Sequence, residues 1–80
     1  STMGSAQTTE YKQFLARLRA AREEAGYKQA EVAELLFEQD QAWMSKVERG
    51  VRRIDVIELA KLARLYKKPA RYFVPSFPPE

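Results

Sequence analysis

The sequence QAEVAELLFEQDQAWMSKVERG, residues 29–50, decides the fold of this 80-residue chain. Apolar residues recur at helical spacing in its first half, and Met44 and Val47 continue that spacing in the second. Asp40 can accept the unpaired backbone N–H groups at the start of a helix, and Gly50 suits the left-handed position that ends one. The stretch therefore predicts two short amphipathic helices joined by a turn.

Two helices that meet across a short turn make a helix-turn-helix candidate, and DNA-binding proteins that use this motif place its second helix in the major groove. With Met44 and Val47 turned toward the core, the opposite face of the second helix is polar and basic. This face consists of Gln41, Ala42, Lys46 and Arg49. It suits a DNA groove, and an ordinary solubilising surface is the alternative.

The composition excludes several classes of function. The chain has no cysteine and no histidine, so disulfides, thiol catalysis, imidazole bases and the usual zinc sites are excluded. Because the sequence offers no Gly-rich phosphate loop, metal-ligand cluster or nucleophile with a base, we predict neither an enzyme nor a bound cofactor or metal. No apolar run approaches the roughly 20 residues that cross a bilayer, and we predict a soluble cytoplasmic protein.

The net charge of +3 is unevenly distributed along the chain. Residues 1–45 carry five Lys or Arg against seven Asp or Glu, whereas residues 46–79 carry nine against three. A basic block that begins inside the second helix of the motif is what attraction to nucleic-acid phosphate requires.

The sequence before the motif predicts one long helix. It runs from Thr9, its expected N-cap, to Ala25, and Gly26 ends it. Its apolar face consists of Tyr11, Phe14, Leu15, Leu18 and Ala21 or Ala25. Residues 1–8 are small and polar, and we predict a disordered segment outside the fold.

Two more helices are predicted after the motif. Asp55 and Glu58 resemble a capping box, and the helix that they open extends to about Tyr66. Its apolar stripe consists of Val56, Leu59, Ala60, Leu62, Ala63 and Tyr66. Pro69 can open a short fifth helix over residues 70–74. The fold class is therefore predicted to be all-α, a compact bundle of five short helices.

The bundle places a single domain at residues 9–74. Residues 75–80, PSFPPE, are predicted to be a proline-rich tail or the start of a linker, because their prolines prevent a helix from continuing.

Four short motifs together resemble the helix-turn-helix family of phage repressor and Cro proteins, also called the xenobiotic-response-element family. They are REEAG at residues 22–26, QAEVA at 29–33, SKVERG at 45–50 and LAKLA at 59–63. The resemblance covers Tyr11 to Val74 and implies a lambda-repressor-like domain of a bacterial or phage regulator. It implies a repressor that binds double-stranded DNA as a homodimer, with the helix at about residues 41–49 in the major groove.

The resemblance also implies roles for individual residues. Gln29 would clamp a phosphate and support the recognition helix, and Arg22 would pair with Glu48 as part of the scaffold. The resemblance assigns DNA contacts to Gln29, Gln41, Ala42, Lys46 and Arg49. The full predicted DNA-binding set adds residues near that helix, and it consists of Lys28, Gln29, Gln41, Ala42, Trp43, Ser45, Lys46, Arg49, Arg52 and Arg53. Within that set, Trp43 is expected to be half-buried, with packing on sugar and phosphate as the alternative.

Two departures from the family pattern affect the motif. The turn is one residue longer than usual, and Phe37 or Glu38 stands where a glycine is expected. Lys28 replaces the usual Ser or Thr cap, so the start of the helix at Gln29 is weakly signalled. We therefore expect a recognition helix tilted differently from that of other family members.

Apolar residues crowd the C-terminal end, which predicts a homodimer formed there. The predicted interface consists of Tyr66, Tyr72, Phe73, Val74 and Phe77. An antitoxin or a restriction–modification controller of the same fold is one alternative function. A protein-interaction module that keeps the scaffold without binding DNA is another.

Overall fold

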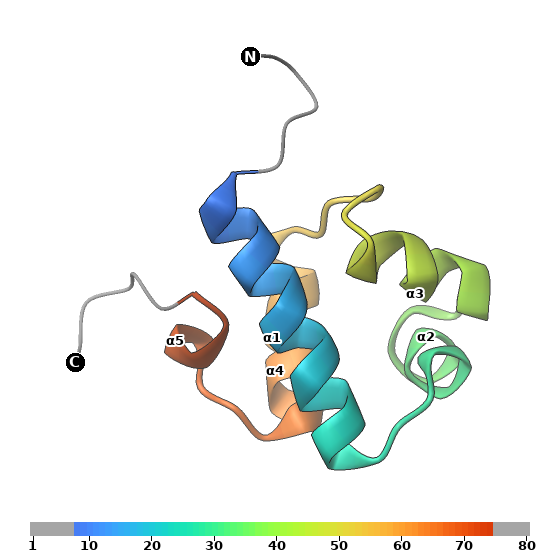
Figure 1. Ribbon diagram of the computed structural model, residues 1–80. Helices are drawn as coiled ribbons and strands as arrows, with labels where there is room; N and C mark the ends of the chain where they lie inside the picture. Colours follow the sequence, from blue (N-terminus) through green and yellow to red (C-terminus); the bar gives the residue numbers. More distant parts are fainter. Residues whose placement is uncertain (1–7, 75–80) are drawn as a thin grey trace.

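The computed structural model describes residues 8–74, which form five helices around one core (Figure 1). The helices are α1 (Thr9–Ala25), α2 (Gln29–Phe37), α3 (Gln41–Glu48), α4 (Val56–Tyr66) and α5 (Ala70–Phe73). Because none of the described residues lies in a strand, the all-α prediction is confirmed.

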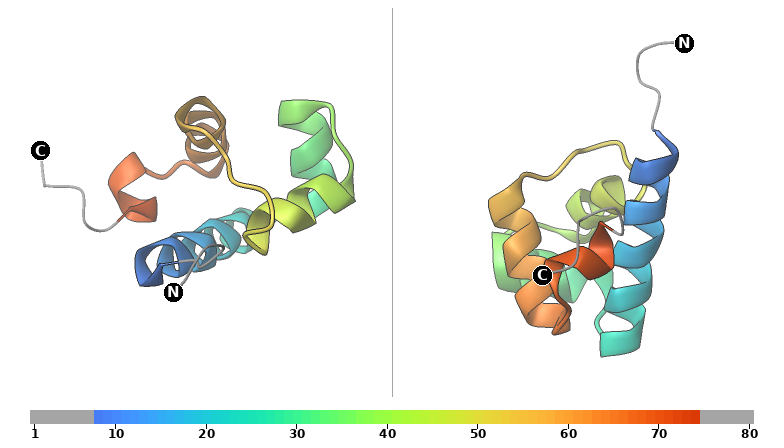
Figure 2. Two further views of the ribbon diagram at one scale, coloured as in Figure 1. Left: turned by 90° about the horizontal axis from the view of Figure 1, so that it is seen from above. Right: turned by 90° about the vertical axis from the view of Figure 1, so that its left-hand side faces the viewer.

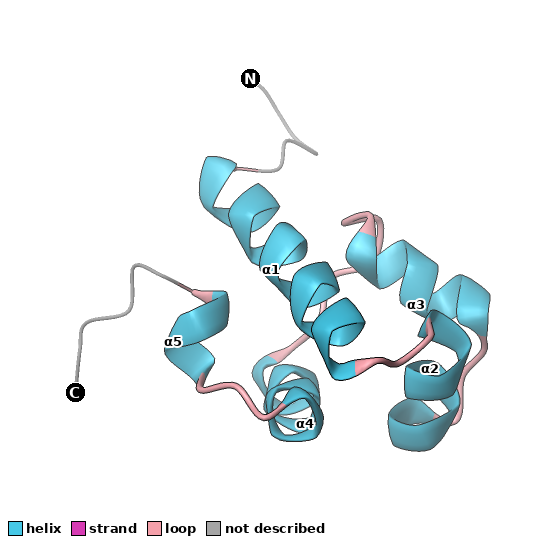
Figure 3. Cartoon of the chain, turned by 60° about the horizontal axis from the view of Figure 1, so that its bottom comes forward, coloured by secondary structure: helices cyan, strands magenta, loops and turns pink. Residues whose placement is uncertain are grey.

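The longest helix, α1, lies in the middle of the molecule. It contacts α3, α4 and α5, whereas α2 packs mainly against α3. The pair of α2 and α3 lies on one side of α1 and α5 on the other, and the views in Figures 2 and 3 agree on this arrangement. The helix-turn-helix is therefore held at one edge of the bundle, through α3.

The core receives side chains from every helix. Its fully buried large residues are Leu18, Val32, Met44, Val47, Leu62 and Phe73. On α1, Phe14, Leu15 and Ala21 are also buried as predicted, but Tyr11 is half-buried and Ala25 is exposed.

For two residues of α4, the prediction that they belong to the apolar stripe is wrong. Val56 is 78% exposed, and Ala60 also faces solvent. Burial on α4 instead follows Leu62, Ala63 and Tyr66, and Ala60 lies outside the arc that they define. Val56 stands in the first turn, beyond the edge of the core.

Side-chain caps mark where α1, α3 and α4 begin. Thr8, not Thr9, caps α1, since its hydroxyl accepts from the Tyr11 backbone N at 3.0 Å. Thr8 therefore belongs to the fold, and residues 1–7 and 75–80 lie outside the described residues. The caps predicted at Asp40 and Asp55 are confirmed, with backbone donors at 3.0 and 2.7 Å.

The ends of the helices follow equally local chemistry. Gly26 and Gly50 adopt left-handed backbone conformations with φ of 86° and 81°, as predicted. α5 ends at Phe73, one residue earlier than predicted, and Val74 is its C-cap. α2 ends at Phe37, and its C-cap Glu38 has φ of 56° although it carries a side chain.

Replacing Glu38 with glycine is expected to stabilise the domain by about 0.5–1 kcal/mol, because glycine avoids the steric cost of left-handed backbone. Thermal unfolding would measure the gain. Glu34→Gly is the matched control, since it places glycine inside α2, and it should cost about 1 kcal/mol. A loss of stability in both variants would contradict strain at Glu38.

Candidate nucleic-acid interface

The turn between α2 and α3 is fixed at both ends by hydrogen bonds. The Gln39 backbone N donates to the carbonyl oxygen of Ala33 at 3.1 Å, which closes the end of α2. One residue later, the Asp40 carboxylate caps α3 at the Trp43 backbone N. The turn between the two helices consists of Glu38, Gln39 and Asp40, and the left-handed backbone of Glu38 begins it.

One face of α3 is open to solvent. Met44 and Val47 are fully buried, whereas the opposite face is exposed, as the helical spacing predicted. The exposed residues are Gln41, Ala42, Lys46 and Arg49. Ser45 is half-buried, and its hydroxyl accepts from Nε of Arg49 at 3.2 Å.

The predicted pair of Arg22 and Glu48 joins α1 to α3 as a two-point ion pair. Arg22 Nε donates to Glu48 Oε2 at 2.6 Å, and Nη2 donates to Oε1 at 3.1 Å. The two side chains are only 11% and 4% exposed. The third contact of the guanidinium, from Nη1 to the Tyr27 carbonyl oxygen at 2.9 Å, leaves it well satisfied.

The ion pair also shifts the pKa of the arginine. The hydrogen bond to Glu48 raises the pKa of Arg22 above its ordinary value, although burial opposes the shift. The positive charge of the buried guanidinium is thus matched inside the domain by the Glu48 carboxylate.

Gln29 extends this pair to the exposed end of α3. Its Nε2 donates to Glu48 Oε1 at 2.9 Å, and its Oε1 accepts from Gln41 Nε2 at 2.7 Å. The residue that opens α2 thus contacts both ends of α3. Lys28, just before it, is exposed and provides no side-chain cap, and the Glu31 carboxylate instead accepts from the Lys28 backbone N at 2.8 Å.

Arg52 lies in a second ion pair that the sequence did not predict. Its two terminal nitrogens donate to the Glu58 carboxylate at 3.2 and 3.1 Å. This contact lowers the pKa of Glu58 below its ordinary value. The guanidinium also lies 4.7 Å above the ring of Trp43, which is half-buried as expected and packs on Phe37 at 4.6 Å between ring centroids.

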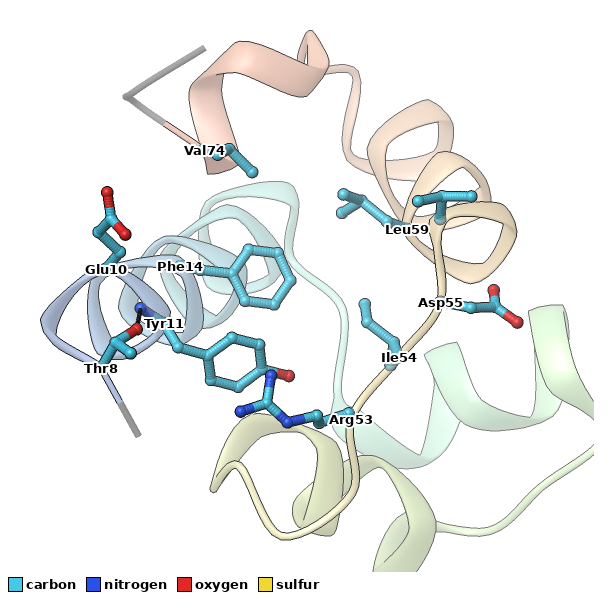
Figure 4. Close-up of a pocket in the computed structure, with 10 residues that line it drawn as sticks. Thr8, Glu10, Tyr11, Phe14, Arg53, Ile54, Asp55, Leu59 and Val74 are labelled. Carbon is cyan, nitrogen blue, oxygen red and sulfur yellow. Dashed lines mark hydrogen bonds between the residues drawn. The ribbon is translucent and has the colours of Figure 1, made fainter. Parts of the chain in front are cut away.

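Arg53 is directed toward α1. Its guanidinium lies 4.4 Å from the centre of the Tyr11 ring, at the rim of an open cleft of about 340 Å³ (Figure 4). The lining of the cleft is mainly apolar and includes Tyr11, Phe14, Ile54, Val56, Leu59 and Val74. Among the basic residues predicted to bind DNA, Lys46 lies on the exposed face of α3 and Arg49 is the exposed C-cap of this helix.

The residues predicted to form a dimer interface are mostly part of the core. Tyr66 and Phe73 are buried, so they are not available to a partner, and Tyr72 and Val74 are half-buried. The C-terminal end is less exposed than its composition suggested because α5 folds back onto α1 and α4. Phe77 lies outside the described residues. The large apolar residues that are exposed in the described part are Leu35, Val51, Val56 and Ile57.

Two classes of site find no support in residues 8–74. These residues contain no group of His, Cys, Asp and Glu that could hold a metal ion. None of the helices that they form is long and apolar enough to cross a membrane.

The geometry defines a helix-turn-helix domain with an exposed second helix, and comparison with protein families agrees. A family described as a helix-turn-helix domain matches residues 13–70. The chain belongs to this family, which is of the phage repressor and Cro type predicted from the sequence. Comparisons with curated proteins and with solved structures gave no match.

Replacing Glu48 with alanine is expected to lower the free energy of unfolding by about 3 kcal/mol, because Arg22 would keep a buried charge without its carboxylate. Denaturant unfolding would measure the loss. Glu23→Ala removes an exposed carboxylate that pairs with Arg19 at 3.2 Å, and it should cost under about 1 kcal/mol. Equal losses in the two variants would contradict a structural role for the buried pair.

Proposed function

We propose that this chain is a sequence-specific DNA-binding regulator, a repressor, that inserts α3 into the major groove. One observation carries the proposal: the exposed face of α3 is polar and basic, while its opposite face and its two ends are held by the bundle. A helix whose buried face is fixed by the bundle and whose exposed face is polar suits the reading of base edges.

Base reading is assigned to the start of α3. Gln41 carries both a donor and an acceptor, the combination that matches N6 and N7 of adenine in the major groove. Ala42 is exposed beside it and is small enough to contact a thymine methyl group. Lys46, one turn later, can donate to guanine or to phosphate.

Phosphate binding is assigned to basic residues around α3. Arg49 lies at the end of the helix, and Lys28 lies just before Gln29. The second N–H of the Gln29 side-chain amide is available for a phosphate oxygen, since the first is donated to Glu48. Trp43, Ser45, Arg52 and Arg53 complete the proposed contact set, with Arg52 and Arg53 contributing charge from the loop after α3.

We also propose that the protein acts as a homodimer, through a different surface from the one predicted from the sequence. Val51, Val56 and Ile57 are exposed and lie close together in the chain, and Val56 borders the apolar cleft. This surface follows α3 directly, so two copies that meet there would bring their recognition helices to one side of the DNA. A spacing of about 34 Å, one helical turn, would match a two-fold site.

Substituting Gln41 or Arg49 with alanine separates base reading from phosphate binding. Gln41→Ala is expected to lower the free energy of binding by roughly 1–3 kcal/mol on the DNA site that the wild-type protein selects from random duplexes. It should also relax the base preference at one base pair per half-site. Arg49→Ala should weaken binding to all duplexes alike. It should also reduce the slope of log affinity against log salt concentration by about one. Titrations of selected and random duplexes at several salt concentrations measure both effects.

The same titrations test the alternative functions. A module that keeps the scaffold for protein binding alone would leave random duplex unbound at low salt. A uniform loss in Gln41→Ala with a changed base preference in Arg49→Ala would show that α3 is oriented differently in the groove. An antitoxin or a restriction–modification controller would bind DNA in the same way and would differ in its partners.

Ile57→Glu is expected to abolish dimer formation without unfolding the domain, because it places charge on the proposed interface while glutamate is favourable in the first turn of α4. Sedimentation would show a monomer, and affinity for a full site would fall to that for a half-site. Leu35→Glu is the matched control, since both side chains are 62% exposed. Unchanged association in Ile57→Glu would exclude this surface.

A further inference from the structure

We infer that Glu48, buried behind α3, determines the orientation of the Gln41 side-chain amide and thereby its base preference. The inference rests on the proposed function, because it concerns how Gln41 reads DNA. It makes Glu48 a positioning residue, since a side chain that is only 4% exposed does not reach the DNA.

The first step concerns Gln29. A glutamine amide has an oxygen end and a nitrogen end of nearly equal size, so its orientation is decided by its partners. Glu48 is held by Arg22 as a carboxylate, which accepts hydrogen bonds and donates none. Gln29 must therefore turn its NH₂ group toward Glu48, as the 2.9 Å contact has it.

The second step passes this orientation to α3. Because the nitrogen of Gln29 faces Glu48, its carbonyl oxygen faces Gln41. Gln41 must then present its own NH₂ group, which donates at 2.7 Å. The opposite orientation would bring two carbonyl oxygens together, with the loss of a hydrogen bond and added repulsion.

The third step concerns the base. With one N–H bound to Gln29, Gln41 keeps one N–H donor and its carbonyl acceptor for DNA. Adenine requires this donor and acceptor in a fixed order, the donor toward N7 and the acceptor toward N6. A reversed amide would place oxygen against N7. The negative charge of Glu48 thus selects, through two hydrogen bonds, which way round Gln41 meets a base.

A neutral residue at position 48 would not make this selection. Glutamine there could offer Gln29 either an oxygen or an NH₂ group, so both orientations of the chain of amides would form. Arg22 matters because its guanidinium compensates the charge of the buried carboxylate and holds it through two hydrogen bonds.

The decisive variant is Arg22→Met with Glu48→Gln, which removes both charges together and leaves neither unpaired. The preference for A·T at the base pair identified by Gln41→Ala is expected to fall from roughly tenfold or more to about threefold or less. Affinity for random duplex at low salt should stay within about twofold, since no proposed phosphate contact is changed. Selection from a randomised site measures preference at every position at once.

Two further variants complete the test. Gln29→Met cuts the link to Gln41 while it keeps the ion pair, and it should relax the same base pair, so the test stands even if the double variant does not fold. Arg19→Met with Glu23→Gln removes an exposed ion pair that has no link to Gln41, and it should leave base preference unchanged.

The possible outcomes separate this inference from the proposed function. Wild-type base preference in a folded double variant, or in Gln29→Met, would overturn the role of Glu48 and leave DNA binding intact. Loss of preference spread over all positions would also overturn it, because a merely structural defect acts in that way. Failure of the wild-type chain to bind any duplex at low salt would overturn the proposed function itself.

Discussion

The Arg22–Glu48 ion pair is the constraint on which the arrangement of the helices depends. Two charges removed from water cost several kcal/mol each unless the remaining hydrogen-bonding capacity is used. Here the guanidinium contacts Glu48 and the Tyr27 carbonyl oxygen, and the carboxylate also accepts from Gln29. An apolar pair could stabilise the domain equally well. The hydrogen bonds of this pair add directional contacts to the apolar packing of Met44 and Val47.

The elements of the fold could be predicted because their signals are local. Asp40, Asp55 and Gly26 each act within a few residues of their own position, so their sequence context is sufficient. The errors at Thr9 and Val74 are shifts of one residue at a helix end. Val56 was misassigned for a different reason: helical spacing gives the direction of a side chain but not where the core ends.

The scaffold pair of the candidate site and the exposed face of α3 were predicted from the sequence, whereas several contacts of the basic side chains were not. The family pattern brought together Arg22, Glu48 and Gln29, and helical spacing gave the exposed face of α3. The directions of Arg52 and Arg53 could not be read from the sequence, because a long side chain has several partners within reach and packing chooses among them. The sequence also could not show which apolar residues stay exposed after packing, namely Leu35, Val51, Val56 and Ile57.

The contact between α1 and α5 sets the order of events during synthesis. The apolar side of α1 is made first, yet Phe73, which is fully buried, belongs to the last helix, and Arg17 donates to the Tyr72 carbonyl oxygen at 3.1 Å. Nearly the whole domain must therefore leave the ribosome before the face of α1 that contacts α5 is covered. Until then that face of α1 stays exposed, and the core is complete only when α5 has been made.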